Sequence, residues 1–146
     1  MNVSPSSRTV EILLVEDSPS DAQLMREALR ESRLSNSLHT VADGEEAMTF
    51  LRRLPPYDSA PRPDLIFLDL NLPRKSGREV LADLKADEQL RNIPVCVLTT
   101  SSHENDIAEA YALDASCYLT KPLDVEDFIS QVQAVYNFWF PKSAGS

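Results

Sequence analysis

Leu65-Ile66-Phe67-Leu68-Asp69 (LIFLD) is the stretch of this sequence that decides the fold. Four large apolar residues follow one another without polar alternation, and an acid comes directly after them. A short run of this kind is typical of a strand buried on both faces, as in a parallel sheet covered by helices. The run therefore predicts a central strand with Asp69 at its carboxyl end.

The segments on both sides of this run alternate between strand and helix patterns. The predicted strands are Glu11–Val15, Ser37–Val41, Leu65–Leu68, Val95–Thr99 and Cys117–Thr120. The predicted helices run from Pro19 to about Ser32, from Asp43-Gly44 through Leu54, from Gly77 to Ala86, from Glu104 to Leu113 and from Asp124 onward. Five strands alternating with five helices predict an α/β fold, a doubly wound parallel sheet of the (βα)5 kind.

Local signals place the first two helices. Ser18 is an N-cap residue, Pro19 suits the first helical position, and an acid stands at the third. At helical spacing, the apolar faces are Leu24, Met25, Ala28 and Leu29 in the first helix and Ala47, Met48, Leu51 and Leu54 in the second. Residues 55–63 hold four of the ten prolines and predict a stiff loop.

Length and composition predict one domain. A chain of 146 residues, 42% hydrophobic and 25% charged, is the size of a single globular unit. We expect residues 1–146 to form one domain with a core of about 11–138, a flexible N-terminal lead-in and a flexible C-terminal tail, which leaves no room for a separate output domain. The net charge of −9 disfavours nucleic-acid and membrane binding.

The sequence also predicts a cytoplasmic protein. Cys96 and Cys117 lie in separate apolar runs, which favours buried free thiols in a reducing compartment. The N-terminal stretch lacks the apolar segment of a signal peptide, and the chain has no apolar run long enough to span a membrane.

Polar residues follow four of the five predicted strands. They are Glu16 and Asp17, then Asp69, then Thr99-Thr100, and finally Thr120-Lys121-Pro122. Because the carboxyl ends of parallel strands meet at one edge, where ligands bind in such sheets, these residues should converge. Three converging carboxylates would repel one another without a hard divalent cation such as Mg²⁺ or Mn²⁺. An Asp there could attack a phosphoryl group, while a lysine and a hydroxyl bind its oxygens.

Each of these residues alone has an ordinary explanation as a turn former or helix cap. Their joint arrangement is specific, and the ordered motifs VEDSPSD, FLDLNLPRKSG, VCVLTTSS and CYLTKP resemble the receiver domains of two-component response regulators. The resemblance covers roughly Glu11 to Phe138. The phrase DLNLPRKSGREVL and the aromatic C-terminus look most like the single-domain regulators of cyanobacterial and other bacterial phytochrome kinases.

The resemblance implies a CheY-like fold with strand order 2-1-3-4-5. It also implies that Asp69 accepts a phosphoryl group from a sensor histidine kinase and that Mg²⁺, for which Mn²⁺ may substitute, is held by Glu16, Asp17, Asp69 and the main-chain carbonyl of Asn71. The other implied roles are phosphoryl binding by Thr99 and Lys121, switching by Thr99 and Tyr118, and a cis Lys121-Pro122 bond. The output would be altered protein contacts, with no turnover enzymology beyond self-phosphorylation and autodephosphorylation.

Departures from the common family pattern are small. Glu16 stands where Asp is commoner, and Leu72 where Met is frequent. Asn71 and Ser101 occupy positions that tune phosphate lifetime in the family, so that lifetime stays open. His39 and His103 are isolated and lack the helical dimerisation context of a phosphohistidine, so neither is a predicted site.

Three alternatives compete with this interpretation. A haloacid-dehalogenase-type phosphatase needs a general acid two residues after its nucleophile, where this chain has Asn71. A flavodoxin-like carrier needs a hydroxyl- and glycine-rich loop where Glu16 and Asp17 stand. A degenerate receiver would be a binding module that is never phosphorylated, but the residues of the acceptor site are present.

The last predicted helix suggests self-association. Its apolar stripe, explained by packing on the sheet, comprises Val125, Phe128, Ile129, Val132, Val135, Tyr136 and Trp139. Phe138 and Phe140 fall off this stripe and would form an exposed patch. We therefore expect a homodimer through the face made by the fourth helix, fifth strand and fifth helix, with Phe138, Trp139 and Phe140 as interface candidates. Docking on the kinase is the rival explanation.

Overall fold

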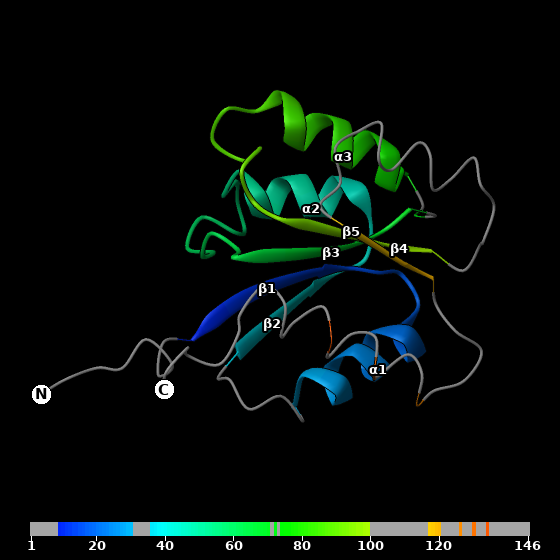
Figure 1. Ribbon diagram of the computed structural model, residues 1–146. Helices are drawn as coiled ribbons and strands as arrows, with labels where there is room; N and C mark the ends of the chain where they lie inside the picture. The colour runs from blue at the N-terminus through cyan, green and yellow to red at the C-terminus, as the bar shows by residue number, and fades with distance from the viewer. Residues whose placement is uncertain are drawn as a thin grey trace, which may run out of the picture.

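A computed structural model describes residues 9–30, 36–70, 72, 74–99, 117–120, 126, 130 and 134, with the backbone alone at 99, 117, 118 and 120. Five parallel strands form one sheet in the order β2-β1-β3-β4-β5 (Figure 1). They are β1 (Val10–Val15), β2 (Asn36–Val41), β3 (Leu65–Asp69), β4 (Val95–Thr99) and β5 (Cys117–Thr120). The predicted strands and their predicted order are confirmed.

Helices cover both faces of the sheet. Helix α1 (Pro19–Arg30) lies on one face, and α2 (Gly44–Leu51) and α3 (Gly77–Ala86) lie together on the other (Figure 1). The helix predicted at Glu104–Leu113 lies outside the described residues. Of the helix predicted from Asp124 onward, residues 126, 130 and 134 are helical and exposed. The doubly wound arrangement is thus confirmed for the described part of the chain.

Strand side chains alternate between two hydrophobic clusters. In β1, Leu13 and Val15 pack toward α2 and α3, whereas Ile12 and Leu14 pack toward α1. The same alternation occurs in β3 and β4, and all five residues of β3 are buried. Burial on both faces explains why these strands read as continuous apolar runs. Cys96 belongs to the α1-side cluster as a buried free thiol, as expected.

Helix capping sets where α1 and α3 begin. The Ser18 hydroxyl accepts a hydrogen bond from the Asp21 N–H at 3.3 Å, as its N-cap position predicts. Before α3, Ser76 and Glu79 form a reciprocal capping box, in which each side chain binds the other residue's backbone N–H. These caps fix the two helix starts that follow β1 and β3, and so position the edge of the sheet where those strands end.

The prediction that Leu54 belongs to the apolar face of the second helix is wrong. Helix α2 ends at Leu51, and Leu54 is 50% exposed. Arg53 takes a left-handed conformation with φ 55°, and the N–H groups of Arg53 and Leu54 bind the carbonyls of Phe50 and Thr49. This is the hydrogen-bond pattern of a Schellman motif. The helix closes here because Leu54 precedes Pro55, and a residue before proline disfavours the helical conformation.

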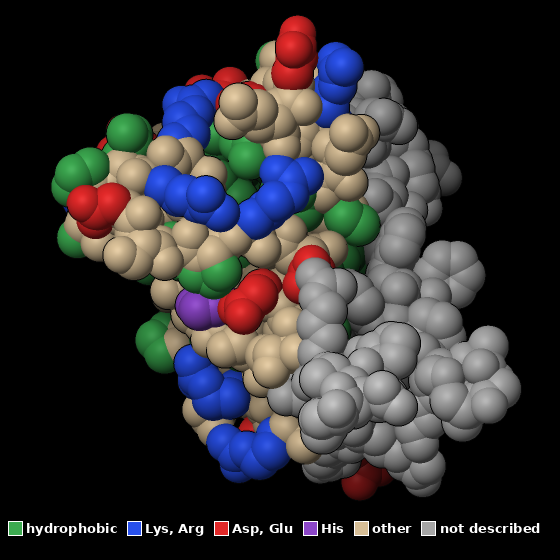
Figure 2. All heavy atoms as spheres, turned by 90° about the vertical axis from the view of Figure 1, so that its left-hand side faces the viewer, with side chains coloured by type: hydrophobic (Ala, Val, Ile, Leu, Met, Phe, Trp, Pro, Cys, Tyr) green, Lys and Arg blue, Asp and Glu red, His purple; other side chains and the backbone are tan. Residues whose placement is uncertain are grey.

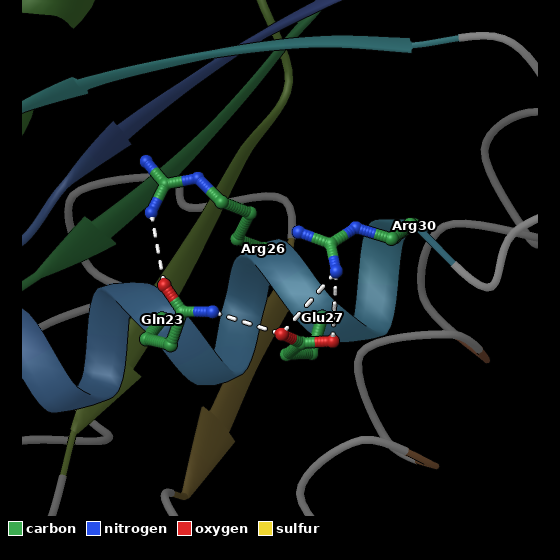
Figure 3. Close-up of polar contacts among 4 residues, drawn as sticks. All are labelled: Gln23, Arg26, Glu27 and Arg30. Atoms are coloured by element: carbon green, nitrogen blue, oxygen red, sulfur yellow. Dashed lines mark hydrogen bonds and ion pairs between the residues drawn. The ribbon is translucent and has the colours of Figure 1, made fainter.

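The outer face of α1 carries a polar network. Gln23 bonds both Arg26 and Glu27, and Glu27 also pairs with Arg30 at 3.3 Å (Figure 3). The opposite face of the helix holds its buried residues, Ala22, Met25, Ala28 and Leu29. Of the predicted apolar face, Leu24 is only partly buried. Within the described ranges, no helix has the length and apolar character that crossing a membrane requires.

Candidate functional site

Three carboxylates meet at the carboxyl edge of the sheet. Asp69 ends β3, and Glu16 and Asp17 follow β1, which pairs directly with β3 through Val15 and Leu68. One oxygen from each of the three side chains lies within 4.8 Å of the others. The predicted convergence of these residues is therefore confirmed.

The burial of this cluster makes its charge costly. Glu16 is 3% exposed and Asp69 6% exposed, whereas Asp17 is open to solvent. Like charges at this separation repel one another, and the repulsion is screened less where two of them are largely removed from water. A hard divalent cation resolves the repulsion, and the donor set of carboxylate oxygens fits Mg²⁺ or Mn²⁺. The residues present thus suit a divalent metal, and Asp17 is the exposed member of the set.

Backbone contacts hold Glu16 in place. Its N–H bonds the carbonyl of Val41 at 3.0 Å, which extends the pairing between β1 and β2 by one step. Its carboxylate accepts the Ser18 N–H at 3.1 Å, so this side chain bends back over the turn that opens α1. The longer side chain of Glu, compared with Asp, allows this local hydrogen bond while a carboxylate oxygen remains within the cluster.

Gly77 packs against the backbone of Asp69. A Cβ atom added to Gly77 would lie 2.2 Å from the Asp69 carbonyl oxygen and 2.6 Å from the Cα of Leu70. The Gly77 N–H also donates to the Leu70 carbonyl at 3.1 Å. From the sequence, Gly77 is expected only to begin a helix. The signal that could have singled it out is the Ser76-x-x-Glu79 capping box, which places the first turn of α3 directly after the loop from Asp69.

A second glycine fixes the same loop from the other side. A Cβ on Gly44, the first residue of α2, would lie 2.1 Å from the Lys75 carbonyl oxygen. Arg74 has φ 65°, and its guanidinium lies 3.6 Å from the Asp43 carboxylate. Residues 74–76 therefore pack against the amino-terminal end of α2 and lead straight into α3. No pattern in the sequence predicts this contact.

The remaining predicted site residues divide into two groups. The backbones of Thr99 and Tyr118 are described, and Thr99 ends β4 one residue beyond Leu98, the partner of Asp69. The register thus places Thr99 at the same edge as the carboxylates. The other predicted positions lie outside the described residues: Asn71, Ser101, Lys121, Pro122, Phe138, Trp139 and Phe140.

Two polar pairs outside the edge have structural roles. His39 Nε2 lies 2.8 Å from a Glu11 carboxylate oxygen, and its ring packs on Phe50. The Tyr57 hydroxyl donates to the Glu46 carboxylate. This hydrogen bond, with burial, raises the pKa of Tyr57 to about 12. Both pairs fasten segments on the side of the sheet that α2 covers.

Comparison with known proteins agrees with this geometry. The family model of the response regulator receiver domain matches residues 12–133. Response regulator Rcp1 of Synechocystis sp. is 48% identical over 128 residues, which cover 88% of this chain and 87% of that protein. The polar-differentiation response regulator DivK of Brucella anthropi is 32% identical over 123 residues, 84% of this chain and 93% of that protein.

Solved structures extend the similarity to three dimensions. The Mn²⁺-bound form of Rcp1 matches with a TM-score of 0.87 and 46% identity, over 92% of this chain and 97% of that one. The phosphorylated cyanobacterial phytochrome response regulator RcpA matches with a TM-score of 0.89 and 45% identity, over 94% and 98%. Receiver domains bind a divalent metal in an acidic pocket, and Glu16, Asp17 and Asp69 form such a pocket here. The chain belongs to the response regulator receiver domain family.

Proposed function

We propose that this protein is a phosphorylation switch that takes a phosphoryl group from a sensor histidine kinase onto Asp69. The observation that carries the proposal is the cluster of Glu16, Asp17 and Asp69, with Asp69 at the end of the central strand of a receiver fold. Asp69 is the member that both ends a strand and has its main chain clamped by Gly77. A fixed backbone is what a nucleophile needs for in-line attack.

Atoms and charge balance in the proposed phosphoryl transfer. A carboxylate oxygen of Asp69 attacks the phosphorus of a phosphohistidine whose other ring nitrogen carries a proton. The P–N bond breaks, its electron pair stays on the nitrogen, and a neutral imidazole leaves as the acyl phosphate forms. When bound, the divalent cation neutralises negative charge on the phosphoryl oxygens. Glu16 and Asp17 are proposed to hold it together with Asp69 and the main-chain carbonyl of Asn71. Lys121 and the Thr99 hydroxyl are proposed to bind the phosphoryl oxygens.

We further propose that the kinase is a phytochrome. Support comes from two relatives: RcpA, whose structure is described as a cyanobacterial phytochrome response regulator, and Rcp1, which is 48% identical to this chain. The similarity covers 88% of this chain for Rcp1 and 94% for RcpA. The net charge of −9 gives no support to a nucleic-acid or membrane partner.

The output is proposed to be a change in protein contacts. The acyl phosphate would draw the Thr99 hydroxyl inward and let Tyr118 move into the space left, which shifts a pre-existing equilibrium of the neighbouring surface. A homodimer through that surface, with Phe138, Trp139 and Phe140 in the interface, is part of the same proposal. Asn71, in the place of a general acid, disfavours turnover on outside substrates.

The test is phosphotransfer from an autophosphorylated kinase of the phytochrome class, with Mg²⁺ present. Asp69→Asn keeps the size of the side chain and removes the nucleophile, so labelling should disappear. Asp87→Asn is the matched control, because Asp87 lies in the turn after α3, where it bonds the Gln89 N–H. An Asp69→Asn protein that labels as fast as the Asp87→Asn protein would refute the acceptor assignment.

A further inference from the structure

The opposite, amino-terminal edge of the sheet carries a hollow lined by arginines. It has a volume of about 240 Å³ and lies between the end of α2, the loop before β3 and the turn after α3. Its lining comprises Leu51, Arg52, Arg53, Arg62, Asp87, Gln89 and Leu90. Figure 2 shows Lys and Arg side chains gathered over the upper half of this face, around apolar surface.

Within the described ranges, no ion pair joins Arg52, Arg53 or Arg62 to a carboxylate. Arg30, Arg74 and Lys75, which do form ion pairs in the part of the chain that the structure describes, do not line the hollow. Asp87, the acid in the lining, instead accepts the Gln89 N–H at 2.8 Å and so caps its own turn. The lining thus has a formal charge of +2, from three arginines and one aspartate, in a protein of net charge −9.

Helix capping does not explain these arginines. Cations near the end of a helix often neutralise its free carbonyls. At the end of α2, the carbonyls of Met48, Thr49 and Phe50 already accept the backbone N–H groups of Arg52, Leu54 and Arg53. The side chains of Arg52 and Arg53 are therefore not needed to satisfy these three carbonyls.

The hollow is also built with some rigidity. The left-handed backbone of Arg53 is fixed by the two hydrogen bonds that close α2. Arg62 donates through Nη1 to the Gln89 carbonyl and so bridges the loop before β3 and the turn after α3. Leu51 and Leu90 are both buried in the core and form an apolar part of the lining. Arginines held in this way have less conformational entropy to lose when they bind a ligand.

We propose that this hollow binds a compact phosphate-bearing small molecule. Guanidinium groups match the oxygens of phosphate bidentately, and the apolar lining accommodates a small organic group attached to it. The site is separated from the acidic cluster by the length of the strands, so its ligand would not compete with the phosphoryl group at Asp69. A bound anion here would tie α2 to the loop before β3 and the turn after α3.

The test uses phenyl phosphate and inorganic phosphate as probes at constant ionic strength, with no divalent cation. Amide and arginine Nε–Hε signals are followed by nuclear magnetic resonance during each titration. We expect saturable shifts at Arg53, Arg62 and Gln89. The Arg52→Gln, Arg62→Gln double variant should weaken binding at least about tenfold, since charge-assisted hydrogen bonds are lost. Arg26→Gln, an equal loss of charge per site on α1, should bind as wild type does.

Three outcomes would overturn the proposal. The first is linear, unsaturated shifts with both probes. The second is binding that Arg26→Gln weakens as much as an Arg62→Gln single variant does, because that result would indicate general charge attraction. The third is saturation of the hollow by a Glu- and Asp-rich peptide but not by phenyl phosphate, which would assign it to a protein partner instead. Circular dichroism of each variant verifies that the fold is retained.

Discussion

The two edges of the sheet carry clusters of opposite charge. At the carboxyl edge, Glu16, Asp17 and Asp69 converge, and two of them are buried. At the amino-terminal edge, Arg52, Arg53 and Arg62 gather around one hollow and stay exposed. Buried like charges are unfavourable without a ligand, whereas exposed ones are solvated. The carboxyl edge should therefore depend much more strongly on its ligand.

The two edges also differ in how closely their backbone is packed. Asp69 has Gly77 packed on its main chain, and residues 74–76 pack on Gly44, so the acidic edge tolerates no added atoms. The arginines, by contrast, project from the end of α2 and from the loop before β3. A closely packed backbone suits a reacting carboxylate, whereas exposed side chains can bind an anion from solvent reversibly.

The largest effect is expected from Gly77→Ala at the carboxyl edge. Replacing glycine by alanine in a helix usually stabilises a protein slightly. Here the new Cβ would meet backbone atoms at 2.2 and 2.6 Å, so Asp69 or α3 must shift. We expect a loss of about 3 kcal/mol in the free energy of unfolding, measured with urea, and slower phosphorylation of Asp69.

The control for this substitution is Ala82→Gly, the reverse change at an exposed position of the same helix. It should cost only about 1 kcal/mol, from helix propensity alone, and leave phosphorylation unchanged. If Gly77→Ala is instead as stable as wild type, the acidic edge is more adaptable than its packing indicates.

The next largest effect is the stabilisation of the fold by a divalent cation. At a Mg²⁺ concentration of roughly one hundred times the dissociation constant, binding should add about 2.7 kcal/mol to the free energy of unfolding. Asp69→Asn removes one of three mutually repelling charges, so it should raise stability without metal and reduce the gain from metal. Thermal unfolding with Mg²⁺ and with a chelator measures both quantities.

Asp87→Asn provides the comparison at the other edge, since Asp87 lines the arginine hollow. Its response to Mg²⁺ should equal that of wild type. A Mg²⁺ effect that survives in Asp69→Asn at full size would show that the stabilising cation binds elsewhere.

The sequence predicts the carboxylate cluster at the carboxyl edge, but it does not predict the arginine hollow at the amino-terminal edge. Uninterrupted apolar runs mark the strands because both faces are buried, and parallel strands bring their carboxyl ends to one edge. Glu16, Asp17 and Asp69 could therefore be placed together. Arg52, Arg53 and Arg62 come from a helix end and a proline-rich loop, and their meeting with Gln89 depends on loop conformations that no periodicity encodes.

The same distinction explains why the sequence wrongly places Leu54 in the second helix and why it does not predict the contact of Gly77 with Asp69. Leu54 continues the helical spacing of α2, but the left-handed Arg53 ends the helix before it. The hydrophobic period cannot reveal a backbone that changes direction. Gly77 was visible as a helix start, whereas its contact with the Asp69 carbonyl depends on how α3 packs on the sheet, a tertiary feature.

A smaller effect is expected from Tyr57→Phe, which tests how the loop before β3 is held. The Tyr57 hydroxyl bonds Glu46 in the first turn of α2, and this hydrogen bond attaches the loop to the start of the helix. The same loop carries Arg62. The substitution should cost about 1.5 kcal/mol in the free energy of unfolding near neutral pH. It should also weaken anion binding at the arginine hollow if that hollow depends on the loop.

The pKa of Tyr57 predicts a pH dependence with a definite sign. Its folded-state pKa of about 12 exceeds the ordinary value of 10.0, so the folded protein holds this proton more tightly than the unfolded chain does. The contribution to stability is present below pH 10 and is lost as the pH rises from about 10 to about 12. The stability difference between wild type and Tyr57→Phe should therefore shrink across this window. A difference that stays constant to pH 12 would contradict the proposed hydrogen bond.

The smallest effect is expected on α1, whose outer face belongs to neither edge and serves as the baseline for both. Glu27 pairs with Arg30 at 3.3 Å and also bonds Gln23, but the Arg30 and Glu27 side chains are 64% and 42% exposed (Figure 3). Water and salt screen such pairs, so Glu27→Gln should change the free energy of unfolding by no more than about 0.5 kcal/mol. Urea unfolding at low and high salt measures this change, and high salt should reduce it further. Because Glu27→Gln removes one negative charge, as Asp69→Asn does, the two variants alter the net charge of the protein equally. A rise in metal-free stability in Glu27→Gln as large as in Asp69→Asn would therefore mean that net charge, rather than crowding of carboxylates at the carboxyl edge, limits stability, and the contrast between the two edges would not hold.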